Sequence, residues 1–124
     1  MKEQSCTTLN LLHILGKKWS IPILEELYYS KNNIQFNELN RRVAGVTPKN
    51  LTSTLQELNF LGLIKKIDMS VGNSKHIEYS ITKNGELAVS LIKTTKEYGA
   101  YITKGEEKSC RSRKCIECDG FKSL

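Results

Sequence analysis

A run of short polar side chains between residues 47 and 62 is the part of this sequence best suited to chemistry. In TPKNLTSTLQELNFLG, Leu51, Leu55 and Leu58 recur at helical spacing, so one side of a helix is apolar. The opposite side carries small donors and acceptors: Lys49, Asn50, Thr52, Ser53 and Gln56. Side chains of this kind can approach base edges in the major groove of DNA. The pattern favours base reading; the alternative is an ordinary solvated helix face.

Individual contacts can be assigned within this segment. Asn50 suits adenine, Lys49 suits guanine, and the methyl group of Thr52 suits the thymine methyl. Thr47 before Pro48 marks the helix start, and its hydroxyl with the N–H groups of the first turn suits phosphate. Gly62 predicts the helix stop.

Basic residues flank this helix on both sides. Arg41 and Arg42 end the preceding segment and can hold backbone phosphates, although adjacent residues on a helix face different directions. After the helix, Lys75 and His76 are expected at the tip of a hairpin, contacting the DNA backbone or minor groove. We interpret Lys65 and Lys66 as solvated strand residues.

Three cysteines near the end of the chain have the spacing of a metal site. Cys110, Cys115 and Cys118 form C-x₄-C-x₂-C, and the C-x₂-C pair can place two sulfurs on one zinc ion. Asp119 or a water could supply a fourth ligand. An iron–sulfur cluster and a flexible tail with free thiols are the alternatives. A thiol-disulfide enzyme is disfavoured because CIEC does not open a helix of a βαβ unit.

Enzymatic function is not expected from the remaining residues. We find no Ser-His-Asp set, phosphate loop or carboxylate pair at catalytic spacing, and the two histidines have no evident partners. Trp19 is interpreted as a core residue, and Phe60 is expected to pack under the hairpin.

The elements that must position these residues follow from periodicity. Two short helices joined by a glycine-containing turn are typical of a helix-turn-helix, and a hairpin directly after them is a wing. The fold class is therefore mainly α with a small β hairpin, a winged helix-turn-helix. The expected helices are residues 7–15, 19–29, 37–45, 48–61 and 83–102, and the expected strand-like runs are 34–36, 63–67 and 77–81.

The last helix carries a second apolar stripe. The stripe has more apolar surface than one small neighbouring element could bury; its residues are Leu87, Leu91, Tyr98 and Ile102. Packing within the same chain is one explanation. We favour a homodimer interface, because recognition helices and wings commonly act in pairs.

Length and charge limit the possible domain organisation and the class of partner. The 124 residues suit one domain over residues 1–102, followed by a cysteine-rich tail over 103–124. The net charge of +6 favours a polyanionic partner without proving one. No apolar run approaches the ~20 residues that span a bilayer, and MKEQSCTTLN lacks the order of a signal peptide. We expect a cytoplasmic protein without a membrane partner.

Three segments resemble one protein family. GKKWSIPILEEL, FNELNRRVAGVTPKNLTSTLQELNFLGLIKK and IEYSITKNGELA occur in the order and spacing of the HxlR-type winged helix-turn-helix transcriptional regulators, across roughly residues 6–102. The resemblance departs at Gln35, where the family usually has arginine, and at Ser74, Lys75 and His76, where it has proline and then arginine.

The resemblance implies further expectations. The family forms homodimers through its first and last helices and binds operator DNA through the helix-turn-helix and wing. Its cysteine before the first helix is matched by Cys6, which suggests a redox-responsive thiol at the dimer interface. Because the terminal helices meet there, Cys6 is also a candidate fourth ligand for the tail. We therefore expect a sequence-specific regulator that binds double-stranded operator DNA; the alternative is a winged-helix module that binds protein.

Overall fold

The computed structural model describes residues 6–30, 32–103 and 113–124. Within them the chain is mainly helical with one small sheet, which confirms the predicted fold class. The elements in chain order are α1 (Thr7–Leu15), α2 (Ser20–Tyr29), β1 (Ile34–Gln35), α3 (Phe36–Arg42), α4 (Pro48–Phe60), β2 (Ile64–Asp68), β3 (Ile77–Ile81), α5 (Lys83–Ile102), the 3₁₀ turn η1 (Cys115–Glu117) and α6 (Asp119–Lys122).

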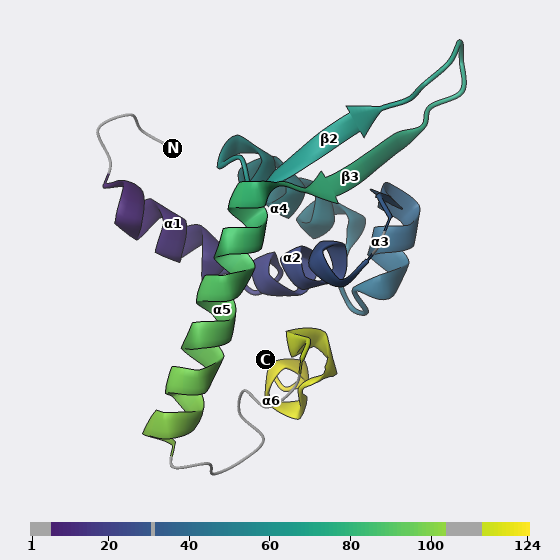
Figure 1. Cartoon of the computed structure of the whole chain (residues 1–124). Helices are drawn as coiled ribbons and strands as arrows, with labels where there is room; N and C mark the ends of the chain where they lie inside the picture. The colour runs from purple at the N-terminus through teal and green to yellow at the C-terminus, as the bar shows by residue number, and fades with distance from the viewer. Residues whose placement is uncertain (1–5, 31, 104–112) are drawn as a thin grey trace.

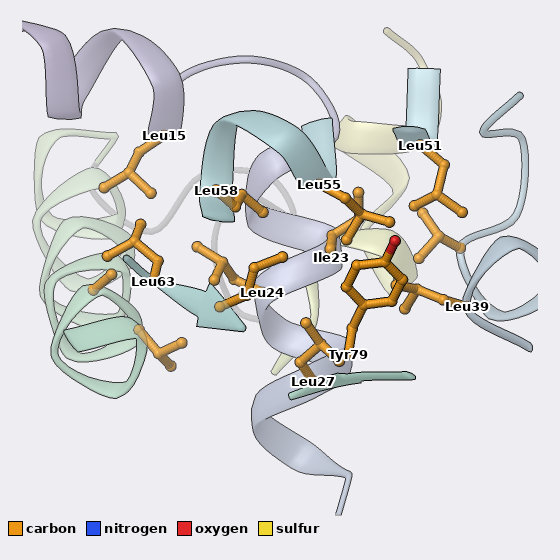
Figure 2. Close-up of a cluster of buried hydrophobic side chains, with 14 of the residues drawn as sticks. Leu15, Ile23, Leu24, Leu27, Leu39, Leu51, Leu55, Leu58, Leu63 and Tyr79 are labelled. Atoms are coloured by element: carbon orange, nitrogen blue, oxygen red, sulfur yellow. The ribbon is translucent and has the colours of Figure 1, made fainter. Parts of the chain in front are cut away.

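The centre of the core is α2, which is surrounded by the other helices and the sheet. Ile23 and Leu24 of this helix have no exposed surface, and the predicted stripe on α4 packs against them (Figure 2). Leu51, Leu55 and Leu58 are all buried, as the helical spacing predicts. Burying side chains of this size contributes about 1.5–3 kcal/mol each, so the stripe determines which face α4 turns outward.

The sheet has the order β1-β3-β2 with antiparallel pairing throughout. The pairs Ile34↔Tyr79 and Ile64↔Ile81 set the register and place apolar side chains toward the helices. The short strand β1 lies at the edge, as expected from its length. The β2–β3 hairpin projects from the body of the molecule as the wing (Figure 1).

The helix-turn-helix has well-defined ends. Thr47 caps α4, since its side-chain oxygen accepts a hydrogen bond from the Asn50 N–H at 3.1 Å. Gly62 follows the helix with φ 75°, a conformation that favours glycine. The predicted bounds of α3 were wrong: the helix spans Phe36–Arg42 instead of 37–45. It starts directly from the β1 pairing, and the chain turns at Val43 before Gly45, whose φ is 95°.

The start of α5 lies against the sheet. Thr82 caps the helix by accepting from the Gly85 N–H at 3.1 Å, and its own hydroxyl donates to the Gly62 carbonyl. A Cβ added at Gly85 would come within 2.1 Å of the Leu63 carbonyl oxygen. Glycine is therefore required for this close approach, which fixes where α5 leaves the domain.

The end of the chain is folded onto the domain, which sequence periodicity did not predict. Residues 113–124 pack beside α2 (Figure 1), with Ile116 against the core and Phe121 edge-on to Trp19 at 5.7 Å. The two buried carboxylates of α2 hold this segment. Glu25 accepts from the Cys115 N–H at 2.8 Å, and Glu26 pairs with Lys114 at 3.2 Å.

Candidate nucleic-acid interface

The outer face of α4 is polar from its first turn. Lys49, Asn50, Thr52, Ser53 and Gln56 are all exposed, as predicted. Thr47 is also exposed, and its hydroxyl hydrogen stays available because the oxygen serves the cap as an acceptor. The helix therefore presents short donors and acceptors around its capped N-terminus.

Phe60 lies on the last turn of the same helix and corrects one expectation. Its side chain is 68% exposed and does not pack under the wing. The nearest hollow that it lines includes Ile14 and Glu57, on the α1 side of the molecule. Phe60 is exposed because helical spacing places it on the same outer face of α4 as Ser53 and Gln56.

The arginines of α3 are not free cations. Arg41 and Arg42 both pair with Glu38, Arg42 through its Nε at 2.8 Å. The hydrogen bond from Arg42, and then that from Arg41, holds the pKa of Glu38 below its ordinary value. Sequence reasoning missed this partner, although the i,i+3 and i,i+4 spacing signals it. A phosphate at this place would have to compete with the Glu38 carboxylate.

The two predicted wing residues lie in different environments. Lys75 is exposed beside the turn closed by Val71 and Ser74. His76 lies below the tip rather than at it, because its carbonyl accepts from the Met69 N–H in the ladder.

The ring of His76 faces back toward the domain. Its Nδ1 is 2.9 Å from Gln35 Nε2, and its Nε2 is 2.7 Å from Glu78 Oε2. The His76 hydrogen bond, followed by one from Asn33, lowers the pKa of Glu78. Gln35, the position where this chain departs from the family pattern, thus braces the base of the wing.

A hollow of about 140 Å³ lies where α4 meets the sheet. Lys66 reaches it from β2, although the sequence suggested an ordinary solvated residue. The signal that could have indicated this position is strand alternation, since Lys66 shares a face with the buried Ile64. The lining residues are Thr52, Leu55, Gln56, Asn59, Lys66 and Tyr79.

The predicted dimer stripe lies on the outside of α5. Leu87 and Tyr98 are each 62% exposed, and Leu91 and Ile102 are also exposed. The side of α5 facing the domain uses different residues, among them Ala88, Val89 and Ile92. Leu9 and Leu12 of α1 add exposed apolar surface, and α1 lies beside α5 in Figure 1.

The cysteines fall in two regions. Cys6 is exposed and precedes α1, where its carbonyl accepts from the Asn10 N–H. Cys115 and Cys118 bracket the η1 turn, with the Cys118 N–H donating to the Cys115 carbonyl at 2.9 Å. Cys110 lies outside the described residues, as does the side chain of Asp119. Among the described side chains, no three of His, Cys, Asp and Glu are grouped to hold a metal ion.

The helices of the described segments include none that is long and apolar enough to cross a membrane. α5 is the longest of them with 20 residues, and three lysines and two glutamates interrupt its apolar positions.

Comparisons with known proteins agree with this geometry. Residues 14–107 match the HxlR-like helix-turn-helix family. An uncharacterized HTH-type transcriptional regulator of Methanothermobacter thermautotrophicus is 29% identical over 107 residues, covering 86% of this chain and 79% of that protein. The uncharacterized HTH-type transcriptional regulator YdzF of Bacillus subtilis is 34% identical over 88 residues, covering 71% and 79%.

Solved structures with the same fold include the transcriptional regulator YtfH from Salmonella typhimurium. It superposes with a TM-score of 0.65 at 28% identity, covering 78% of this chain and 83% of that one.

Proposed function

Because this chain belongs to the HxlR-like helix-turn-helix family, we propose that it is a transcriptional regulator that binds double-stranded operator DNA in a sequence-specific manner. The observation that carries this proposal is the outer face of α4. Its exposed Lys49, Asn50 and Ser53 stand on a capped N-terminus, which is the part of a recognition helix that reads bases. Thr52 and Gln56 extend the face that reads bases, and Thr47 binds a phosphate of the DNA backbone.

The wing and α3 supply the backbone contacts in this proposal. Lys75 reaches phosphate or the minor groove beside the wing tip. His76, which the sequence suggested as a second contact, instead holds the base of the wing through Gln35 and Glu78. Arg41 and Arg42 lie at the end of α3, exposed enough to meet phosphate when they leave Glu38. Contacts of this kind position the protein but do not select the sequence.

We further propose that the active species is a homodimer built on α1 and α5. The exposed Leu87, Leu91, Tyr98 and Ile102 support it, since a monomer in water rarely leaves such a stripe uncovered. A two-fold axis through this surface pairs two recognition helices on one face of DNA.

The thiols carry two subsidiary proposals. Cys6, exposed before α1, is a redox-responsive group: Cys6→Ser should abolish release of DNA by hydrogen peroxide, and unchanged release would place sensing elsewhere. Cys110, Cys115 and Cys118 bind zinc. The tight turn between Cys115 and Cys118 supports this, because two thiolates on one ion need such a turn.

Elemental analysis of protein purified without chelator tests the zinc proposal. Near-stoichiometric zinc without visible colour would support it, and loss of zinc in Cys115→Ser would place the ion. Visible absorption bands would instead indicate an iron–sulfur cluster.

Fluorescence anisotropy with labelled duplex DNA tests the central proposal. Binding should weaken steeply as salt rises, since phosphate contacts release counterions. Lys75→Ala should flatten that dependence and leave base preference unchanged. Absence of DNA binding at low salt would contradict the proposal and favour the alternative, a winged-helix module that binds protein.

A further inference from the structure

The hollow between α4 and the sheet is lined by Leu55 and by five side chains that can each donate a hydrogen bond. Thr52, Gln56 and Asn59 project from α4 on one side, and Lys66 reaches over from β2. The lining includes no Asp or Glu. A hydroxyl, two amides and an ammonium around one small space have the chemistry of an anion site.

The cross-strand register explains why Lys66 is there. Lys66 is directly opposite Tyr79, so the two side chains share the face of the sheet that turns toward the helices. Two pairs earlier, Ile64 and Ile81 lie on that same face, and Ile64 is buried in the core. The strand leaves the core at Lys66, whose ammonium therefore stands at the rim beside α4.

The hydroxyl of Tyr79 is an unused donor at the bottom of this space. The residue is only 9% exposed, and its ring packs in the core with the oxygen directed toward α4 (Figure 2). Within the described ranges no group hydrogen-bonds to this hydroxyl. It keeps some contact with solvent, because Asn40 Oδ1 is the one buried side-chain nitrogen or oxygen in those ranges that has no partner. Burial raises the pKa of Tyr79, so the hydroxyl keeps its proton and can donate.

We propose that Lys66, Asn59 and the Tyr79 hydroxyl bind one phosphodiester group of the operator backbone. The ligand follows from position: Thr52 and Gln56 belong both to the reading face and to this hollow. A phosphate here lies where the backbone passes from the recognition helix to the wing. This inference deepens the proposed function and rests on it.

The carboxylate on the same strand face as Lys66 is held by another partner. Asp68 is two residues beyond Lys66 on the same strand face. It accepts from the Ser70 N–H at 2.9 Å, toward the wing tip, and that partner lowers its pKa. Asp68 feels the charge of Lys66 but does not line the hollow, so Lys66 is the one charged group in the lining.

Two neighbouring lysines provide a matched experiment. Lys65 and Lys66 are adjacent and exposed but point to opposite faces of β2. With the full-length protein and an operator duplex, Lys66→Ala should reduce the slope of log K against log salt by about 0.9, the value for one lost phosphate contact. Lys65→Ala should leave the slope unchanged. Equal slopes for the two variants would overturn the proposal.

A phosphate-by-phosphate test identifies the ligand. Operator duplexes carrying one neutral methylphosphonate at successive positions should reveal one phosphate whose neutralisation weakens wild-type binding but not Lys66→Ala. Tyr79→Phe, which removes only the hydroxyl, should lose sensitivity at that same phosphate. If neutralising each phosphate weakens binding equally in the wild type and both variants, the phosphate is not bound in this hollow, whereas the proposal of operator binding is unaffected.

A free-phosphate control separates the two sources of the anion. Inorganic phosphate at constant ionic strength should compete poorly with the operator. Strong competition that disappears in Lys66→Ala would make this a free-phosphate site and overturn the backbone assignment. Failure of the wild type to bind any duplex specifically would instead refute the proposed function.

Discussion

Single residues on α4 carry the most specific part of this account. Asn50 is exposed in the first turn, and its backbone N–H is occupied by the Thr47 cap while its amide side chain faces outward. An amide at this place can make two hydrogen bonds to one adenine, a contact that no other base reproduces.

Replacing Asn50 by alanine should therefore weaken operator binding by about 1–3 kcal/mol and relax the preference at one base position. Anisotropy on a panel of duplexes, each changed at one position, measures both effects. Thr47→Ala is the informative comparison, because it should weaken all sequences together by loosening the cap. Identical preferences in Asn50→Ala and wild type would mean that α4 does not read bases.

The Glu38 cluster limits how strongly α3 can bind DNA. Arg42 and Arg41 hold the pKa of Glu38 below its ordinary value, so the carboxylate stays charged at neutral pH. Phosphate must displace this carboxylate to reach either guanidinium group.

Glu38→Gln should therefore tighten DNA binding and steepen its salt dependence by about one phosphate contact, ~0.9 in slope. Glu86→Gln, an exposed change in the first turn of α5, is the charge-matched control. A Glu38→Gln variant with the slope of that control would show that Arg41 and Arg42 do not contact phosphate.

Among the elements, helix starts were the most predictable from sequence. Thr47 and Thr82 are both hydroxyl caps, and the helices behind them begin where expected. Local rules suffice at these places because the capping oxygen and the N–H it accepts from are three residues apart. The partner of His76 was not predictable, since Gln35 is 41 residues away and joins it only through the sheet.

The C-terminal segment was unpredictable for a similar reason. Its contacts are to Glu25, Glu26 and Trp19, almost a full chain length away, and its helical pieces are too short to show periodicity. Lys96 of α5 joins this cluster by binding both Glu25 and the Arg113 carbonyl. Burial is the largest single influence on the pKa of Lys96 and lowers it, but the Glu25 hydrogen bond and the nearby negative charges together outweigh burial and raise this pKa overall. The segment thus connects α2 to α5.

Phe121→Ala should loosen this segment and expose Trp19, the only tryptophan in the chain. Acrylamide quenching of tryptophan fluorescence should increase, and the emission should shift to longer wavelength. Phe60→Ala is the matched control, because Phe60 is exposed and is not among the ring partners of Trp19. Unchanged quenching in Phe121→Ala would mean that the segment does not cover Trp19 in solution.

At the scale of the whole molecule, α5 has two apolar faces, one of which carries the proposed dimer interface. The face of α5 that holds Val89 and Ile92 closes the core, while the face with Leu87 and Leu91 is exposed next to α1. Sequence periodicity predicted the outer stripe. It did not show which apolar face of α5 is buried and which is exposed, because the residues of both faces repeat at helical spacing.

Leu91→Asp should place a charge in the proposed interface and convert the dimer to a monomer at micromolar concentration. Light scattering measures the mass, and circular dichroism checks that the fold is kept. As a control, Met69→Asp changes an exposed apolar residue on the wing and should not change the mass. A wild-type monomer, or a Leu91→Asp variant of dimeric mass, would contradict the assembly.

Selection of bound sequences from random duplex DNA is the most direct test of whether the protein reads an operator through paired α4 helices. We expect one enriched pseudo-palindrome whose half-sites lie about one helical turn apart, ~34 Å, because a two-fold dimer presents two α4 helices to one DNA face. Recovery of no preferred sequence, despite salt-sensitive binding, would contradict it.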